Sequence, residues 1–284
     1  MSFVQVSRRV KASLAAAAAL LTLVSGYANP ANAAGPWPAR VHASYDIDFN
    51  GLSVGTFDFT SSNDGQTYSL SGNGKLSLLL GAFKWQGETR TTGKLSGDMT
   101  KPQNFAFGYK GSTKSGSTRM SFANDTVTSV LHEPPSPPKP GTVPALPEHL
   151  KGVLDPLTAM MAVSGASLNP CSRRIPIYDG KARFDLVLSP RGMVDLREQR
   201  PSGQPGQGHV CRVKYIPIAG HKADEESKFM AATDGIELIL RPIPSANVFV
   251  PYKITVPTGA GPATLTSRRV DIVTSQHQQI ALVH

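Results

Sequence analysis

Residues 45–59, with the sequence YDIDFNGLSVGTFDF, constrain the fold of this chain more than any other stretch. Polar and apolar residues alternate on both sides of Asn50-Gly51, a dipeptide that is typical of a tight β-hairpin turn. Side chains of a strand point to opposite faces in turn, so the alternation predicts one wet face and one buried face. The stretch therefore predicts two antiparallel strands at the start of the fold.

The same pattern of short strands and turns continues along most of the chain. Alternation recurs at Phe105, Phe107 and Tyr109, and turn sequences such as Asn63-Asp64-Gly65 follow one another at short intervals. Regular turns favour an antiparallel sheet that curves or closes over units in which strands and helices alternate. The predicted strands are 41–50, 53–61, 66–73, 83–95, 103–111, 117–123, 126–131, 173–178, 182–188, 193–197, 209–218, 227–232, 236–242, 248–256 and 263–274.

Three segments depart from this pattern. Asp155 suits a helix N-cap and Pro156 the first helical position, so we predict one short helix that ends near Gly165. The apolar run 76–82, LSLLLGA, fits either one helical turn or a buried strand. Residues 132–148 hold seven prolines and few apolar side chains, which predicts a loop.

The first 33 residues have the features of a cleavable secretory signal. Basic residues precede an apolar run over 12–24 that is short for a membrane span, and Ala31-Asn32-Ala33 suits cleavage after Ala33, with Ala34 as the alternative. Cleavage removes three basic residues and no acidic one, so the net charge falls from +9 to +6. We therefore expect a periplasmic protein, with one domain over 34–284 and no transmembrane segment after the signal.

The chain has two cysteines, Cys171 and Cys211, and both follow the predicted signal. An even pair in an oxidising compartment predicts a disulfide, with two free buried thiols as the alternative. In the chain-entropy model, closing a loop of this size contributes roughly 3–4 kcal/mol.

Residues 51–55, GLSVG, match the nucleophile-elbow pattern that places a reactive serine between two glycines. A working elbow lies on a sharp turn from a strand into a helix, whereas strands are predicted on both sides of Ser53. The glycines are more simply explained by a hairpin turn and a β-bulge. We therefore expect no enzyme activity, and hydrolysis through Ser53 remains an alternative.

Other side chains that carry chemistry are scattered. No histidine has the spacing of a recognised metal site, so we predict no metal, no cofactor and no catalytic residue. The basic residues form no dense run of the kind that binds nucleic acid. The histidines are His42, His132, His149, His209, His221, His277 and His284.

Several motifs follow one another in a specific order. Tyr45 and GLSVG at 51–55 precede YSL at 68–70 and a strand pair over 87–97 that leads to Pro102 and Phe105. DPLTA at 155–159, IYDGKARFDL at 177–186 and CRVKYIPIAG at 211–220 come later. Over most of residues 41–275 this order resembles the DUF3108 family of exported bacterial proteins, although the proline-rich insertion at 132–148 departs from it.

The resemblance implies a periplasmic, β-rich protein and carries over no catalytic residue. The architecture is similar to the spiral, disulfide-bearing β proteins linked to envelope integrity in alphaproteobacteria, and more distantly to half-barrels that carry lipoproteins. We therefore expect an all-β fold with one long curved antiparallel sheet, spiral or half-barrel, and the short helix packed on its concave side.

The expected function is non-enzymatic support of the cell envelope by binding a lipid, an apolar segment or a partner protein. A structural envelope protein without a ligand is the alternative, because apolar residues on the concave face either form a binding site or fill the core. These residues are Leu78, Leu79, Phe83, Trp85, Phe105, Phe107 and Met160.

Overall fold

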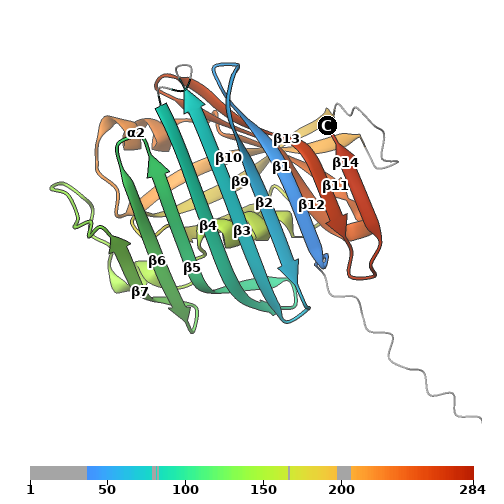
Figure 1. Cartoon of the computed structure of the whole chain (residues 1–284), viewed down its shortest axis with the longest axis horizontal. Helices are drawn as coiled ribbons and strands as arrows, with labels where there is room; N and C mark the ends of the chain where they lie inside the picture. Colours follow the sequence, from blue (N-terminus) through green and yellow to red (C-terminus); the bar gives the residue numbers. More distant parts are fainter. Residues whose placement is uncertain (1–36, 79–80, 82, 166, 197–205) are drawn as a thin grey trace, which may run out of the picture. The chain divides into compact units, whose positions relative to one another are not determined.

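The fold is an antiparallel sheet, as a computed structural model of residues 37–78, 81, 83–165, 167–196 and 206–284 shows (Figure 1). The predicted signal over 1–33 lies outside these described residues. The described strands are β1 (Arg40–Phe49), β2 (Leu52–Asn63), β3 (Thr67–Leu78), β4 (Phe83–Ser96), β5 (Met99–Gly111), β6 (Ser115–Ala123), β7 (Thr126–Glu133), β8 (Arg173–Tyr178), β9 (Arg183–Asp195), β10 (Gln207–Ala219), β11 (Glu237–Ile243), β12 (Val248–Thr258), β13 (Gly261–Val273) and β14 (Gln279–Val283).

The strand order joins two meanders into one sheet. It runs β7-β6-β5-β4-β3-β2-β1-β13-β12-β11-β10-β9-β8, and β14 pairs with β13 beside this path. The pairing of β1 with β13 connects the two meanders, and the sheet is not closed. The predicted all-β class with one long antiparallel sheet is therefore confirmed.

The opening hairpin forms as predicted. Asn50 and Gly51 both have positive φ, 50° and 79°, as a tight turn between twisted strands requires. The register between β1 and β2 shifts at Ile47/Asp48 and leaves Val54 unpaired, which is a β-bulge. A Cβ at Gly55 would overlap with the carbonyl oxygen of Lys75 on β3, so only glycine allows this approach.

Helix α1 (Pro156–Ser164) packs on the side of the sheet that we call the inner face (Figure 1). It contacts β3, β4 and β5 of the first meander and β8 and β12 of the second. Leu157 and Met161 join one apolar cluster, while Ala159 and Val163 join another. The helix therefore forms the centre of the hydrophobic core, as the prediction of a helix packed on the sheet requires.

The segment just before α1 bonds to both outermost strands of the sheet. On the β7 side, Lys151 bridges to Thr126, and the backbone N–H of Gly152 donates to the carbonyl of Asp125 at 2.7 Å. On the β8 side, Leu154 donates to the carbonyl of Pro176 and accepts from the N–H of Tyr178, both at 2.9 Å. Residues 151–154 thus connect β7 to β8.

Three details differ from the sequence prediction. Residues 227–232 were expected as a strand but belong to a second helix, α2 (Glu225–Ala232), so the prediction of one helix is wrong. Its N-cap Asp224 accepts from the N–H of Ser227 at 3.1 Å, and acidic residues in the first turn suit the helix dipole. The predicted strands 182–188 and 193–197 form the single strand β9, and β14 was not predicted.

The loop and apolar segments fit the sequence better. The structure has no helix or strand over 134–146, only an isolated bridge at Thr142, so the proline-rich loop is confirmed there. The two ends of the predicted loop 132–148 differ, because His132 and Glu133 belong to β7 and a 3-10 turn begins at Pro147 (Pro147–Leu150); the second 3-10 turn is Pro244–Ala246. Strand β3 reaches Leu78, which settles the start of the run 76–82 as strand, while 79, 80 and 82 lie outside the described residues. Neither described α-helix is long and apolar enough to cross a membrane.

A half-buried histidine makes stability depend on pH. The Nε2 atom of His284 accepts a hydrogen bond from Nη1 of the fully buried Arg241 at 2.6 Å, and its Nδ1 lies 3.0 Å from the Ser267 hydroxyl. Burial, and then the Arg241 charge, lower the pKa of His284 to about 4.

A lowered folded-state pKa means that the unfolded chain binds the proton more readily. The contribution of His284 to the free energy of unfolding is therefore present above the unfolded pKa of about 6.5, and it is lost as the pH falls through the folded pKa. Because His284 is partly exposed, we expect the free energy of unfolding to fall by only about 1–2 kcal/mol from neutral pH to about pH 4. Urea unfolding of the wild type and of His284→Gln, which does not titrate, tests this: parallel pH profiles would contradict it.

Candidate functional site

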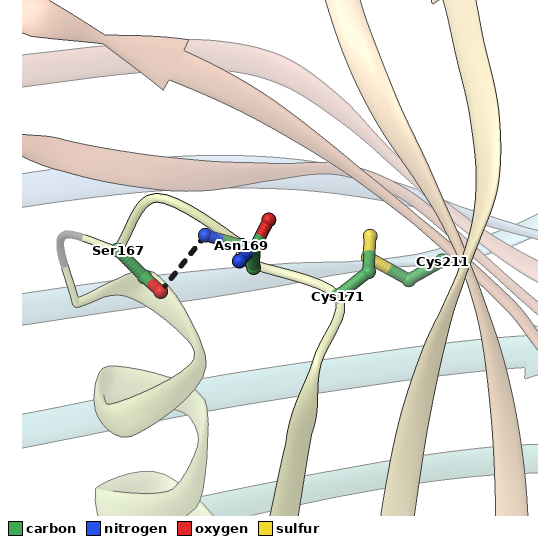
Figure 2. The surroundings of a disulfide bond; sticks show 4 residues. All are labelled: Ser167, Asn169, Cys171 and Cys211. Atoms are coloured by element: carbon green, nitrogen blue, oxygen red, sulfur yellow. Dashed lines mark hydrogen bonds between the residues drawn. A yellow bond between two sulfur atoms is a disulfide. The ribbon is translucent and has the colours of Figure 1, made fainter.

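The disulfide joins the segment after α1 to strand β10. Cys171 and Cys211 are bonded, with Cα atoms 5.1 Å apart, and both side chains are buried (Figure 2). Just before Cys171, the backbone N–H of Asn169 donates to the Ser167 hydroxyl at 3.2 Å. The predicted disulfide is confirmed, and it fixes the segment that follows α1 to β10 in the second meander.

A buried polar network fixes the other end of α1. Asp155 is fully buried, and its Oδ1 accepts from the N–H groups of Leu157 and Thr158 at 3.0 and 3.1 Å. The hydroxyls of Thr158 and Thr91 donate to its carboxylate at 2.5 and 2.7 Å, and the Tyr68 hydroxyl lies 2.9 Å from that of Thr158. Burial raises the pKa of Asp155 although these bonds favour the charged form. The network attaches α1 to β3 and β4.

The space beside α1 is almost filled. Trp37, Tyr45, Phe59 and Met160 line an apolar cavity there, and a water-sized sphere can place its centre in only about 40 Å³ of it. That volume holds at most a few water molecules. The inner face near α1 is therefore a packed core. This agrees with the interpretation that Met160 and the buried Phe105 fill the core.

Farther along the same strands, the inner face is apolar but only half-buried. Trp85 lies six residues from Thr91, or roughly 20 Å along β4 from the Asp155 network. Its ring centroid is 6.5 Å from that of Phe107, which lies 5.9 Å from that of Tyr109. The Trp85 ring covers Gly87, where a Cβ would overlap with it. Phe57 on β2 extends this aromatic row.

The second meander supplies a matching apolar set on the inner face. Phe184 and Tyr215 have ring centroids 5.1 Å apart on β9 and β10, and Ile254, Val256 and Leu265 follow on β12 and β13. All of these side chains are half-buried. We call this set, together with Phe57, Trp85, Phe107 and Tyr109, the distal half of the inner face. Its members are half-buried at the margins of the buried clusters: Phe184, Tyr215, Ile254 and Val256 pack against the cluster that holds Ala159 and Val163, and Phe57 and Leu265 pack against the cluster that holds Leu157 and Met161.

The residues predicted to line a site therefore divide into two groups. Trp85 and Phe107 lie in the distal half, whereas Phe105 and Met160 pack near α1. Leu78 and Phe83 pair with each other where β3 and β4 meet, and Leu79 lies outside the described residues. The prediction missed Phe57, Tyr109 and the whole second meander, although Ile254 and Val256 alternate with polar residues on β12.

Ser53 lies in a strand environment. It is exposed near the start of β2, opposite Asp48, and a hairpin turn rather than a helix adjoins it. The GLSVG motif thus has the turn-and-bulge geometry predicted for it, without the strand-to-helix turn of a nucleophile elbow. Among the described residues, no three His, Cys, Asp or Glu side chains cluster in a way that could hold a metal ion.

Comparison with known proteins gives one match. Searches of the curated proteins and of the solved structures found no significant match to this chain. A family model described as protein of unknown function (DUF3108) matches residues 44–267, which is most of the chain. These residues include the opening hairpin, α1 with its Asp155 cap, and both cysteines. The chain belongs to the DUF3108 family.

Proposed function

We propose that this protein acts in the periplasm, without catalysis, by binding the acyl chain of a lipid on the distal half of the inner face. The observation that carries the proposal is the contrast between the two halves of that face. Near α1 the apolar side chains are buried and leave little space, while the distal side chains pack at the margins of the core clusters and stay partly exposed. Partly exposed aromatic and aliphatic side chains on one face gain free energy when an apolar ligand covers them.

The chemistry of the distal half suits an acyl chain better than a polar ligand. Its side chains are Phe, Trp, Tyr, Ile, Val and Leu, and these offer few directional hydrogen bonds. Each methylene group that such a surface covers contributes about 0.8 kcal/mol. The sequence features of a secretory signal over 1–33 support the periplasmic location, where envelope lipids are accessible.

A matched pair of substitutions on β12 tests the proposal. Val256 faces the distal half and Thr255 faces the opposite side, and both are half-buried neighbours. Val256→Trp should occupy space that the ligand needs and weaken binding of a fluorescent long-chain fatty acid by about tenfold, the equivalent of two covered methylenes. Thr255→Trp should change the affinity by less than about twofold.

Titration of both variants and the wild type with the same fatty acid gives the affinities, and thermal unfolding checks that both variants fold. Equal affinities of the two tryptophan variants would contradict the proposed site. Absence of saturable binding by the wild type would favour the alternative, an envelope protein whose inner face binds no ligand.

A further inference from the structure

We call the side of the sheet opposite the inner face the outer face. It carries a group of lysines without ion-pair partners among the described residues, at one end of β3, β4 and β5. Lys75, Gln86 and Lys110 are neighbours in register on these three strands, and Lys84 pairs with Ser77 one step closer to the strand ends. At this end of the sheet the three lysines, together with Leu76 and Trp85, line a hollow of about 630 Å³. Lys114 follows in the turn after β5.

None of these four ammonium groups forms an ion pair with a described residue. The nearest carboxylate on the outer face of β4, Glu88, instead lies 4.0 Å from Arg90. All four lysines are exposed, so like charges gather on one surface without compensation. Such a surface attracts an anionic partner.

The same end of the sheet exposes large apolar side chains. Gly55 pairs with Leu76 and Leu78 pairs with Phe83, so the starts of β2 and β4 lie at the end where β3 finishes. Leu52 at the start of β2 is 71% exposed, and Phe83 at the start of β4 is 40% exposed. In Figure 1 these strand ends lie together at the top of the view. Apolar tips beside lysines are the combination that binds a membrane interface.

We propose that this end of the sheet, defined by Lys75, Lys84, Lys110, Lys114, Leu52 and Phe83, docks on a membrane surface that contains anionic phospholipids. The lysines face the phosphate groups and the apolar tips enter the interface. The charge complementarity of the outer face carries this inference, which goes beyond the proposed ligand and does not depend on it. Trp85 of the distal half lies between Lys84 and Gln86, so docking brings that half close to the lipids.

Vesicle binding of charge-matched variants tests the docking surface. The chain from Ala34 onward forms a compact unit of its own and lacks the apolar run over 12–24, which would bind vesicles by itself. A polybasic contact gains about fivefold in affinity for each lysine near an anionic surface. The variant K75S/K84S/K110S should therefore bind vesicles of phosphatidylcholine with phosphatidylglycerol about a hundredfold more weakly than the wild type.

The control variant K94S/K139S/K151S removes the same charge from exposed lysines outside this surface. It should bind within about threefold of the wild type, because scattered charges act through the net charge alone. Phe83→Ser should weaken binding without changing any charge. Wild-type binding should fall with added salt and be lost on vesicles of pure phosphatidylcholine.

Equal losses in the two triple variants, or equal wild-type binding to neutral and anionic vesicles, would overturn the docking proposal. The fatty-acid titration separates it from the proposed function. K75S/K84S/K110S should bind the soluble fatty acid like the wild type, because its changes lie on the outer face. A chain that docks on vesicles but binds no fatty acid would contradict the ligand and leave the docking surface supported.

Discussion

Asp155→Ala is expected to lower the free energy of unfolding by roughly 3–5 kcal/mol, the largest effect of any single substitution that we predict. The alanine removes the N-cap of α1 and leaves the hydroxyls of Thr91 and Thr158 without their acceptor in a buried site. Loss of a cap costs about 0.5–2 kcal/mol and each stranded buried hydroxyl costs about 1–3 kcal/mol, so the cap and two hydroxyls could cost roughly 2.5–8 kcal/mol. The expected loss lies in the lower half of this range, because the Tyr68 hydroxyl remains 2.9 Å from that of Thr158 as a partner. Urea unfolding, monitored by circular dichroism, measures the sum.

The other helix provides a matched control. Asp224 caps α2 in the same way, but its carboxylate is exposed and α2 buries no residue. Asp224→Ala should therefore change the stability far less than Asp155→Ala. Similar losses in the two variants would show that capping alone, and not the buried network, determines the effect.

The raised pKa of Asp155 adds a dependence on pH with a definite sign. A carboxyl whose folded pKa lies above its unfolded value of about 3.9 binds the proton more readily in the folded protein. Its contribution is present below the unfolded pKa and is lost as the pH rises through the folded value. The free energy of unfolding of the wild type should therefore fall relative to that of Asp155→Asn as the pH rises above about 4. A constant difference would contradict the burial effect.

Removal of the disulfide is expected to cost roughly 3–4 kcal/mol in the chain-entropy model. The bond closes a loop with a sequence separation of 40, and both cysteines lie in the apolar cluster that includes Ala159 and Val163 of α1. The double variant C171A/C211A releases this loop in the unfolded chain and removes two buried sulfur atoms. Its free energy of unfolding, measured by urea titration, should fall by this amount.

A reductant provides the control for this prediction. Dithiothreitol should lower the stability of the wild type toward that of the double variant and leave the variant unchanged. A wild type that is insensitive to dithiothreitol after unfolding and refolding in its presence would contradict a stabilising role for the bond.

Local sequence signals were sufficient for most of the fold. Asn50-Gly51 predicted the first turn because a tight hairpin needs positive φ, and Asp155-Pro156 predicted the start of α1 because both residues suit a helix N-terminus. Helix α2 was missed because residues 227–232 carry no strong periodicity. Asp224, followed by two acidic residues, is a capping signal that the prediction of a strand over 227–232 does not use.

The candidate site depends on contacts that sequence patterns do not contain. Alternation predicts which face of a strand is apolar, but not which half of that face a helix covers. The position of α1 is set by Tyr68 and Thr91, which lie 90 and 64 residues from their partners Thr158 and Asp155. Only the folded chain therefore separates Met160, in the packed core, from Trp85, in the distal half.

The bonds of residues 151–154 to both β7 and β8 have a consequence for solubility. An open sheet ends in two edges, and the unpaired backbone groups of an edge strand are a template for pairing with another chain. Here one short segment covers part of both edges. Any change that displaces this segment would expose both edges together. Each molecule could then pair with another chain at both edges of its sheet. The segment that leads into α1 thus also protects the chain from forming aggregates through its sheet edges.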